Sequence, residues 1–250
     1  MADLVSIITP TFNAEKFIAE TIKSVQNQTY THWELIIIDD CSTDNTIHLI
    51  EKICQKENRI TLIKNNKNLG PAKSRNIGIQ KSCGKYLTFI DADDLWKKNF
   101  IERSITEIAN TKNPFVFASY ERKDEHLNPH LNDFIVPNKV NYSAILKSNA
   151  ISCLTAFLDV SVLGKKYMPE IKKRQDMGLW LQYLKIIPFA FGIQEPLAIY
   201  RIRKNSLSRN KIDLIKYQWA FYRKIEKLSV FQSFYYLICW MYFGFIKYKQ

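Results

Sequence analysis

Short apolar runs alternate with amphipathic segments through the first hundred residues of this chain. Four short apolar runs predict strands: residues 5–9, 33–38, 60–63 and 86–90. The run at 33–38 is continuously apolar, as in a strand whose two faces are both covered. Three segments between the four runs carry apolar side chains at helical spacing: residues 17–26, 46–53 and 71–79. This alternation predicts an α/β fold with a doubly wound, mostly parallel sheet.

The second half of the chain is less regular. Residues 115–118 predict one further strand, residues 121–141 predict a polar loop region, and residues 175–184 predict a helix. Basic residues then dominate 200–227, and residues 230–246 form a nearly uninterrupted apolar and aromatic run.

These patterns predict one large domain with an appendage. We expect the domain to span residues 1–211, in two halves, 1–95 and 96–211. Residues 212–250 would then form a C-terminal helical extension.

Composition narrows the class of protein. The chain has 250 residues, of which 46% are hydrophobic and 24% are charged, as in globular domains. Its formal net charge of +12 indicates an anionic partner: a nucleic acid, an anionic membrane surface or a phosphate-bearing substrate. Five scattered cysteines without metal-type spacing predict reduced thiols, and the first residues resemble no signal peptide. We therefore expect a cytoplasmic protein.

Polar side chains follow three of the predicted strands. They occupy residues 10–13 (Pro-Thr-Phe-Asn), 39–42 (Asp-Asp-Cys-Ser) and 91–94 (Asp-Ala-Asp-Asp). In open α/β sheets, ligands bind outside the carboxyl ends of the strands. These three clusters are therefore expected to converge on one crevice.

The last of these clusters suits a divalent cation. Asp91 and Asp93 lie two residues apart, directly after a buried strand, and Asp94 follows them. Carboxylates of this kind bind Mg²⁺ or Mn²⁺ together with substrate phosphates and water. The alternative is a solvated turn with helix-capping aspartates. A position opposite Asp39 and Asp40 favours the metal site.

The second cluster suits a nucleobase. A carboxylate of Asp39 or Asp40 can accept the N3–H of a uracil ring, while Thr11 and nearby backbone groups hold the ribose and base. Helix capping by Asp40 or Ser42 is the alternative, and both roles are compatible.

Two cations follow at a helix start. Lys73 and Arg75 come just after Pro71, and a helix N-terminus with a guanidinium favours a diphosphate. As isolated residues they would more often form a solvated helix face.

Four segments together resemble a known family: SIITPTFNAEKFIAETIKSVQNQT, WELIIIDDCSTDNT, NLGPAKSRNIGI and GKYLTFIDADDLW. In this order and spacing they resemble the glycosyltransferase family 2 domain with the GT-A fold. The resemblance is close over residues 4–100 and continues more thinly, through RQDMGLWLQ and YRIRKNSLSRNK, to about residue 211.

The resemblance implies an inverting, metal-dependent enzyme that uses a UDP-sugar donor with Mn²⁺ or Mg²⁺. Asp40 would meet uracil, and Asp93, with Asp91, would bind the metal. The donor would contact a larger set of residues: Pro10, Thr11, Asn13, Asp39, Asp40, Lys73, Arg75, Asp91, Ala92 and Arg203. The acceptor would be a glycan or lipid-linked glycan of a bacterial surface polysaccharide.

Two positions depart from the family pattern. The Glu-Asp pair that usually supplies the catalytic base is Gln175-Asp176 here, which leaves Asp176 as the base. The alternative for Asp176 is a helix N-cap. Many members carry a histidine three residues after the tyrosine that matches Tyr200, where this chain has Arg203. Arginine does not ligate a metal, but it binds a diphosphate as a fixed cation.

Other classes fit the sequence less well. A dinucleotide oxidoreductase or P-loop hydrolase needs a glycine-rich turn after the first strand, and residues 9–13 contain no glycine. A nucleic-acid binder would place a basic stripe across the main domain, whereas the densest basic stretch, 200–227, lies beside the apolar tail. We expect no nucleic-acid partner. A nucleotide-sugar binding protein without transferase activity is the remaining alternative.

The tail at 230–246 has two interpretations. Its length approaches that of a spanning helix, but its many aromatic residues favour the membrane interface. It would then act as a peripheral anchor on the inner face of the cytoplasmic membrane. Alternatively it packs on the catalytic domain or forms a homodimer contact.

Overall fold

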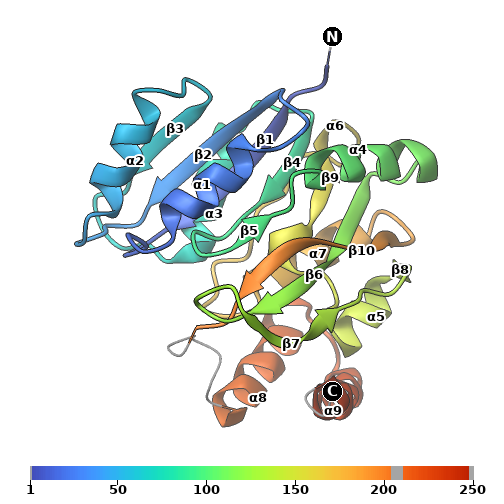
Figure 1. Ribbon diagram of the computed structural model, residues 1–250. Coiled ribbons are helices and arrows are strands. Elements are labelled where there is room, and N and C mark those ends of the chain that lie inside the picture. Colours follow the sequence, from blue (N-terminus) through green and yellow to red (C-terminus); the bar gives the residue numbers. More distant parts are fainter. Residues whose placement is uncertain (1, 204–210, 248–250) are drawn as a thin grey trace.

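The computed structural model describes residues 2–203 and 211–247, and its first half is a parallel sheet with crossover helices (Figure 1). The strands, which pair in parallel in the order β3-β2-β1-β4, are β1 (Val5–Thr11), β2 (Trp33–Asp39), β3 (Ile60–Lys64) and β4 (Tyr86–Phe89). The helices between them are α1 (Ile18–Gln26), α2 (Thr46–Cys54) and α3 (Pro71–Lys81). The predicted elements are confirmed, with ends that differ by one or two residues.

The second half extends the same sheet with antiparallel and parallel pairs. From β4 the order continues β9 (Phe157–Asp159), β6 (Phe115–Lys123), β10 (Ala190–Arg201) and β5 (Leu95–Trp96). β10 runs parallel to β6, and β9 is antiparallel to β4 and β6. The whole is the expected α/β fold with a mostly parallel centre.

The predicted loop at 121–141 is wrong. β6 continues to Lys123, and β7 (Pro129–Phe134) pairs antiparallel with it, while β8 (Lys139–Val140) pairs with β10. The side chains of β7 are almost all exposed, so its sequence carries no apolar alternation. Backbone pairing with β6 makes it a strand.

Helices cover both faces of the sheet. One apolar core joins Ile7 and Ile37 to α1, α2 and α4 (Phe100–Thr111). The other joins Ile8 and Ile38 to α3, α5 (Tyr142–Lys147), α6 (Val160–Leu163) and α7 (Gln175–Leu184), with a 3₁₀ turn at Cys153–Thr155. Alternate residues of β1 thus face opposite layers, and the strand ends meet at one edge.

The C-terminal helices pack on the second core, at the end of the molecule opposite the N-terminus (Figure 1). α8 (Lys211–Ala220) continues through a π-helical turn (Phe221–Ile225) to α9 (Val230–Lys247). Phe221, Tyr222 and Leu237 are buried against α5 and α7. In the described part of the chain, no helix is both long enough and apolar enough to span a bilayer.

Candidate active site

Asp40 fastens the loop that leads into α3. One carboxylate oxygen accepts hydrogen bonds from the Leu69 N–H and the Asn65 Nδ2, both at 2.8 Å, and the other accepts the Gly70 N–H at 2.7 Å. Gly70 has φ of 83°, a left-handed conformation that suits glycine. The buried carboxylate therefore sets where α3 begins, and with it the position of Arg75.

Asp39 and Thr11 face each other across neighbouring strands and keep unused hydrogen-bonding capacity. The two residues are in register between β1 and β2. One oxygen of Asp39 accepts the Ser42 N–H at 3.0 Å. Among the described residues, no partner reaches its buried Oδ1 or the buried Thr11 Oγ1. These atoms are thus available to a ligand at the strand ends.

Asn13 is committed to the protein itself. Its backbone is left-handed, with φ of 49°, and its side-chain oxygen accepts the Thr43 N–H at 2.8 Å. Its own N–H donates to the Ser42 hydroxyl at 2.9 Å. Asn13 therefore orders the loop after β2, next to Pro10 on β1. Donor contacts by Asn13 and Pro10 stay predictions.

The acidic turn after β4 is bound by arginines. Arg75 on α3 forms an ion pair of 2.5 Å with Asp91, and Arg203 forms one of 2.7 Å with Asp93. Asp94 is buried and accepts the Arg201 N–H at 2.8 Å. The structure therefore brings Arg75, Asp91, Asp93 and Arg203 together, as the sequence predicted.

The field at this turn is strongly negative. Burial, then the Asp91 carboxylate, raise the pKa of Asp93, although Arg203 opposes the shift. Burial, then Asp93 and Asp91, raise the pKa of Asp94 well above its ordinary value. Burial opposes the charge of Arg75, but the Asp91 carboxylate outweighs it and raises the pKa of Arg75. Crowded carboxylates of this kind favour a cation between them.

Arg201 holds this turn in place, and sequence reasoning missed it. Its buried guanidinium donates to the Asp93 carbonyl at 2.8 Å, to the Glu125 carbonyl at 2.9 Å and to the Glu20 carboxylate at 2.6 Å. The sequence does place this arginine at the end of a partly apolar segment, residues 190–201, but that segment was not predicted to be a strand.

The Ala92 carbonyl faces α1. It accepts the hydroxyl of Thr21 at 3.0 Å, and the same hydroxyl lies 2.9 Å from the Asp94 carbonyl. Ala92 is thus fixed within the turn, and a direct donor contact by this residue stays a prediction.

Asp176 lies in the first turn of α7, as predicted. Arg174, which precedes the helix, is left-handed with φ of 70°. The Asp176 carboxylate contributes to the electrostatic potential at Arg75 and at the buried Cys153 thiol. Asp176 therefore lies within electrostatic range of Arg75, and its role as the base stays a prediction.

Lys73 is directed away from the acidic turn. It forms an ion pair of 3.1 Å with Glu170, in the segment before α7, and both side chains are largely exposed. Residues two positions apart on a helix face different directions, so Lys73 and the buried Arg75 diverge. The diphosphate role of Lys73 stays a prediction.

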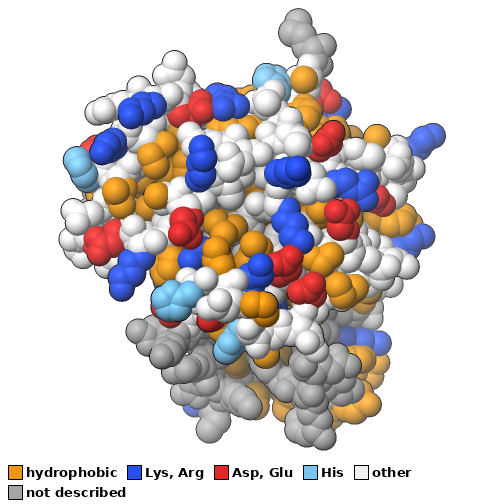
Figure 2. Space-filling view, viewed as in Figure 1, with side chains coloured by type: hydrophobic (Ala, Val, Ile, Leu, Met, Phe, Trp, Pro, Cys, Tyr) orange, Lys and Arg blue, Asp and Glu red, His pale blue; other side chains and the backbone are white. Residues whose placement is uncertain are grey.

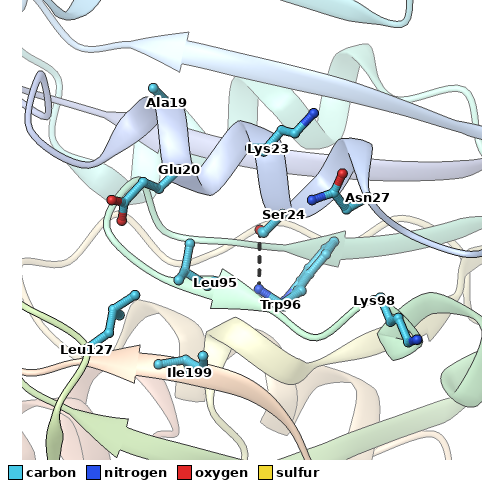
Figure 3. A pocket seen from close by; sticks show the side chains of 10 residues that line it. All are labelled: Ala19, Glu20, Lys23, Ser24, Asn27, Leu95, Trp96, Lys98, Leu127 and Ile199. Atoms are coloured by element: carbon cyan, nitrogen blue, oxygen red, sulfur yellow. Dashed lines mark hydrogen bonds between the residues drawn. The ribbon is translucent and has the colours of Figure 1, made fainter.

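A cleft of about 660 Å³ lies behind the acidic turn, between α1, β5 and β10 (Figure 3). Trp96, whose backbone N–H donates to the Ser24 hydroxyl, lines it together with Leu95 and Ile199. Glu20 also lines it and receives Arg201. The lining contains none of the predicted donor residues, so the cleft is separate from the strand-end crevice.

Asp91 and Asp93 suit a hard cation whose other ligands are phosphate oxygens and water. Within residues 2–203 and 211–247, no group of three or more His, Cys, Asp and Glu side chains is arranged to hold a metal. Two carboxylates, Asp91 and Asp93, are nevertheless the number that Mg²⁺ commonly takes from protein when phosphates and water complete its shell. The residues therefore fit a metal that arrives with a diphosphate.

This fold, with an acidic turn after the fourth parallel strand, is of the GT-A class. The chain belongs to glycosyl transferase family 2, whose sequence profile matches residues 6–166.

Curated relatives support this assignment along nearly the whole chain. It is 38% identical to a putative teichuronic acid biosynthesis glycosyltransferase, TuaG, of Bacillus subtilis, over 92% of this chain and 91% of the relative. It is 36% identical to UDP-Glc:alpha-D-GlcNAc-diphosphoundecaprenol beta-1,3-glucosyltransferase WfgD of Escherichia coli, over 86% and 84%.

Solved structures support the fold. S. aureus TarS 1-349 in complex with UDP-GlcNAc matches with a TM-score of 0.73 and 19% identity, over 95% of this chain and 71% of that one. The mannosyltransferase PcManGT of Pyrobaculum calidifontis, in complex with GDP-Man and Mn²⁺, matches with a TM-score of 0.67 and 17% identity, over 95% and 70%.

Proposed function

We propose that this family 2 enzyme transfers a hexose from a UDP-sugar to a hydroxyl of a lipid-linked glycan, with inversion, during synthesis of a bacterial surface polysaccharide. The observation that carries the proposal is the acidic turn of a GT-A domain, in which Asp91 is paired with Arg75 and Asp93 with Arg203. The names of the relatives from B. subtilis and E. coli support the surface glycan and the lipid-linked acceptor.

The nucleotide would bind where β1 and β2 end. Asp40 keeps one acceptor position on the oxygen that faces Gly70, and Asp39 Oδ1 and Thr11 Oγ1 are unengaged within the described chain. A uracil ring presents one N–H and two carbonyls, and a ribose presents hydroxyls. These groups match the acceptors and the hydroxyl donor that the strand ends offer.

A divalent cation, Mn²⁺ or Mg²⁺, would bind Asp93 and Asp91. When bound, it would neutralise part of the negative charge on the leaving diphosphate. Arg203 lies beside Asp93 and supplies a second fixed positive charge for the phosphates. Arg75, buried against Asp91, orients that carboxylate.

Asp176 would act as the base. As the acceptor oxygen attacks the anomeric carbon, its proton passes to the Asp176 carboxylate, and the bond from that carbon to the diphosphate oxygen breaks. UDP leaves from the opposite face of the sugar. One direct displacement inverts the anomeric centre, so an α-linked donor gives a β-linked product.

The enzyme would work at the inner face of the cytoplasmic membrane. A lipid-linked acceptor is held there, and the net charge of +12 favours an anionic surface. On the face shown in Figure 2, cationic and acidic side chains are interspersed rather than gathered into a basic stripe. That distribution does not favour a nucleic-acid groove.

The test is Asp176→Asn, which keeps the side-chain shape and removes the proton acceptor. We expect UDP-sugar binding to be retained while transfer falls roughly 10²–10⁴-fold. Asp133→Asn, at an exposed position on β7, is the matched control and should transfer normally. Transfer by Asp176→Asn at the control rate would show that Asp176 is only a helix cap.

A second measurement tests the cation. Calorimetry with UDP and Mn²⁺ should show binding that is badly weakened in Asp93→Ala and unchanged in Asp133→Asn. Equal affinity in wild type and Asp93→Ala would remove Asp93 from the metal site. A screen of UDP- and GDP-sugars for donor hydrolysis would identify the sugar.

A further inference from the structure

The outer face of α9 is the most apolar exposed surface in the described chain. Of the sixteen large hydrophobic side chains that are exposed there, eight lie between residues 230 and 243. Six of them recur at helical spacing along one stripe: Phe231, Phe234, Tyr235, Ile238, Met241 and Tyr242. We call this stripe the outer face of α9. Phe231 is 88% exposed, so no part of the described domain covers it.

The opposite face of α9 is already packed. Leu237 and Ser233 are buried, and Tyr236 and Trp240 pack against the second core. The Tyr236 hydroxyl lies 3.3 Å from the Ser143 hydroxyl on α5. The helix is thus held to the domain along its inner side, and rotation that would bury the outer face would expose this inner side.

Exposed charge around α9 is positive. Residues 214–244 contain four cationic side chains, Lys216, Arg223, Lys224 and Lys227, all exposed. The one carboxylate in this range belongs to Glu226, whose side chain is only 2% exposed. It is paired with Lys185 at 2.8 Å and accepts the Tyr142 hydroxyl at 2.6 Å.

A fifth cation adjoins the outer face directly. Lys147 of α5 lies over the ring of Tyr235, with its ammonium 5.7 Å from the centroid. Lys147 and the apolar stripe are therefore parts of one surface.

We propose that this surface docks on an anionic lipid bilayer, with α9 lying in the headgroup region and its outer face directed toward the acyl chains. Aromatic and aliphatic side chains on one stripe, flanked by lysine and arginine, are the composition of interfacial helices. Phosphate-bearing headgroups provide the complementary charge. A second copy of this chain would bring one set of cations against another, which disfavours a dimer across the same face.

Docking in this way would keep the segment that precedes the proposed base close to the membrane. The guanidinium of Arg174 lies over the Trp240 ring at 5.1 Å, and the ammonium of Lys173 lies over the Tyr217 ring at 5.3 Å. α8 and α9 thus hold the segment just before Asp176. This consequence rests on the proposed function, whereas the lipid surface itself does not.

The test is co-sedimentation of the full chain with vesicles of phosphatidylglycerol and phosphatidylethanolamine, or of phosphatidylcholine alone. Wild type should bind the anionic vesicles, less at high salt, and the neutral vesicles weakly. Phe231→Glu with Phe234→Glu should lower the bound fraction at least tenfold. Val162→Glu with Leu131→Glu, at exposed positions far from α9 in sequence, is the charge-matched control and should bind as wild type.

The cations are tested in the same assay. Lys147→Gln with Lys224→Gln should bind anionic vesicles several-fold more weakly, and Lys52→Gln with Lys56→Gln on or just after α2 should not. Equal binding by wild type and the Phe231/Phe234 variant would overturn the proposal. The proposal would also be overturned if the wild-type protein bound no vesicles. It would be overturned as well if ultracentrifugation showed a wild-type dimer that only the Phe231/Phe234 variant dissociates.

Activity separates the two proposals. With a water-soluble acceptor, the Phe231/Phe234 variant should transfer sugar at the wild-type rate, and Asp176→Asn should still bind vesicles. A variant that loses both vesicle binding and soluble-acceptor activity has a disturbed domain, and the smaller change Phe231→Ser then replaces it as the deciding measurement.

Discussion

Asp40→Asn probes the hydrogen bonds that organise the loop before α3. The carboxylate accepts three: Asn65 Nδ2 and the Leu69 N–H on one oxygen, and the Gly70 N–H on the other. An asparagine oxygen can keep the first two. Its amide nitrogen then faces the Gly70 N–H, and two donors meet where the wild type has a bond of 2.7 Å.

The expected loss in the free energy of unfolding is about 2–3 kcal/mol, since hydrogen bonds to charged groups contribute about 1.5–3 kcal/mol and a buried donor is left unpaired. For a chain of this size, that corresponds to a fall in Tm of roughly 5–10 °C. Urea unfolding with an unchanged m-value measures it. Asp39→Asn is the control, because its carboxylate accepts one hydrogen bond, from Ser42, that asparagine can keep. A loss for Asp40→Asn no larger than that of the control would refute the reasoning.

Two further predictions concern stability. Gly78→Ala should lower the free energy of unfolding by about 1–3 kcal/mol in the same urea assay. The reason is that a Cβ there would lie 2.5 Å from Ile8 Cγ2 and 2.9 Å from Ile38 Cδ1. A variant as stable as wild type would mean that α3 can move away from the sheet. Glu57 has a lowered pKa, first through its hydrogen bond with Arg59, so its stabilisation is present above its unfolded pKa and is lost as pH falls through the folded pKa. Glu57→Gln should therefore lose a few tenths to about 1 kcal/mol at pH 7, since the pair is partly exposed, and progressively less as the pH falls through the folded pKa; a loss that does not change with pH would contradict the assignment.

Most of the strands that could be predicted are buried by both layers of helices. β1, β2 and β4 have buried side chains along nearly their whole length, and such runs have no other common explanation. β7 escaped because it is an exposed edge strand whose side chains are polar. β10 escaped because Pro196 and two register shifts interrupt it. In both strands, pairing with β6 decides the structure, and pairing partners are distant in sequence.

The candidate site could be located where its residues share a motif. Asp39, Asp40, Asp91 and Asp93 lie at or just after the ends of β2 and β4, so the topology of the parallel sheet puts them at the same edge. Their roles toward a donor stay predictions. Which cation meets which carboxylate depended on packing. Helix α3 buries one face, and that face carries Arg75 to Asp91 and leaves Lys73 outside with Glu170.

The C-terminal extension shows the same limit. Its apolar run predicted either packing or a membrane contact, and α9 has one packed face and one exposed apolar face. A sequence without alternation cannot assign residues to the two sides. The inner side is chosen by packing against α5 and the second core, which forms only when the domain has folded.

The buried arginine that ends β10 has a consequence for building hybrid enzymes. Arg201 joins three separate stretches of chain: α1 through Glu20, the acidic turn through the Asp93 carbonyl, and the hairpin through the Glu125 carbonyl. Consider a chimaera that takes residues 96–211 from a relative. It would keep these hydrogen bonds only if the transplanted strand also ends in arginine and the recipient keeps Glu20. A chimaera in which Arg201 is kept but Glu20 is lost would leave the buried guanidinium without its carboxylate. The acidic turn, and with it the proposed donor site, would then be held less firmly even though every proposed donor residue was retained.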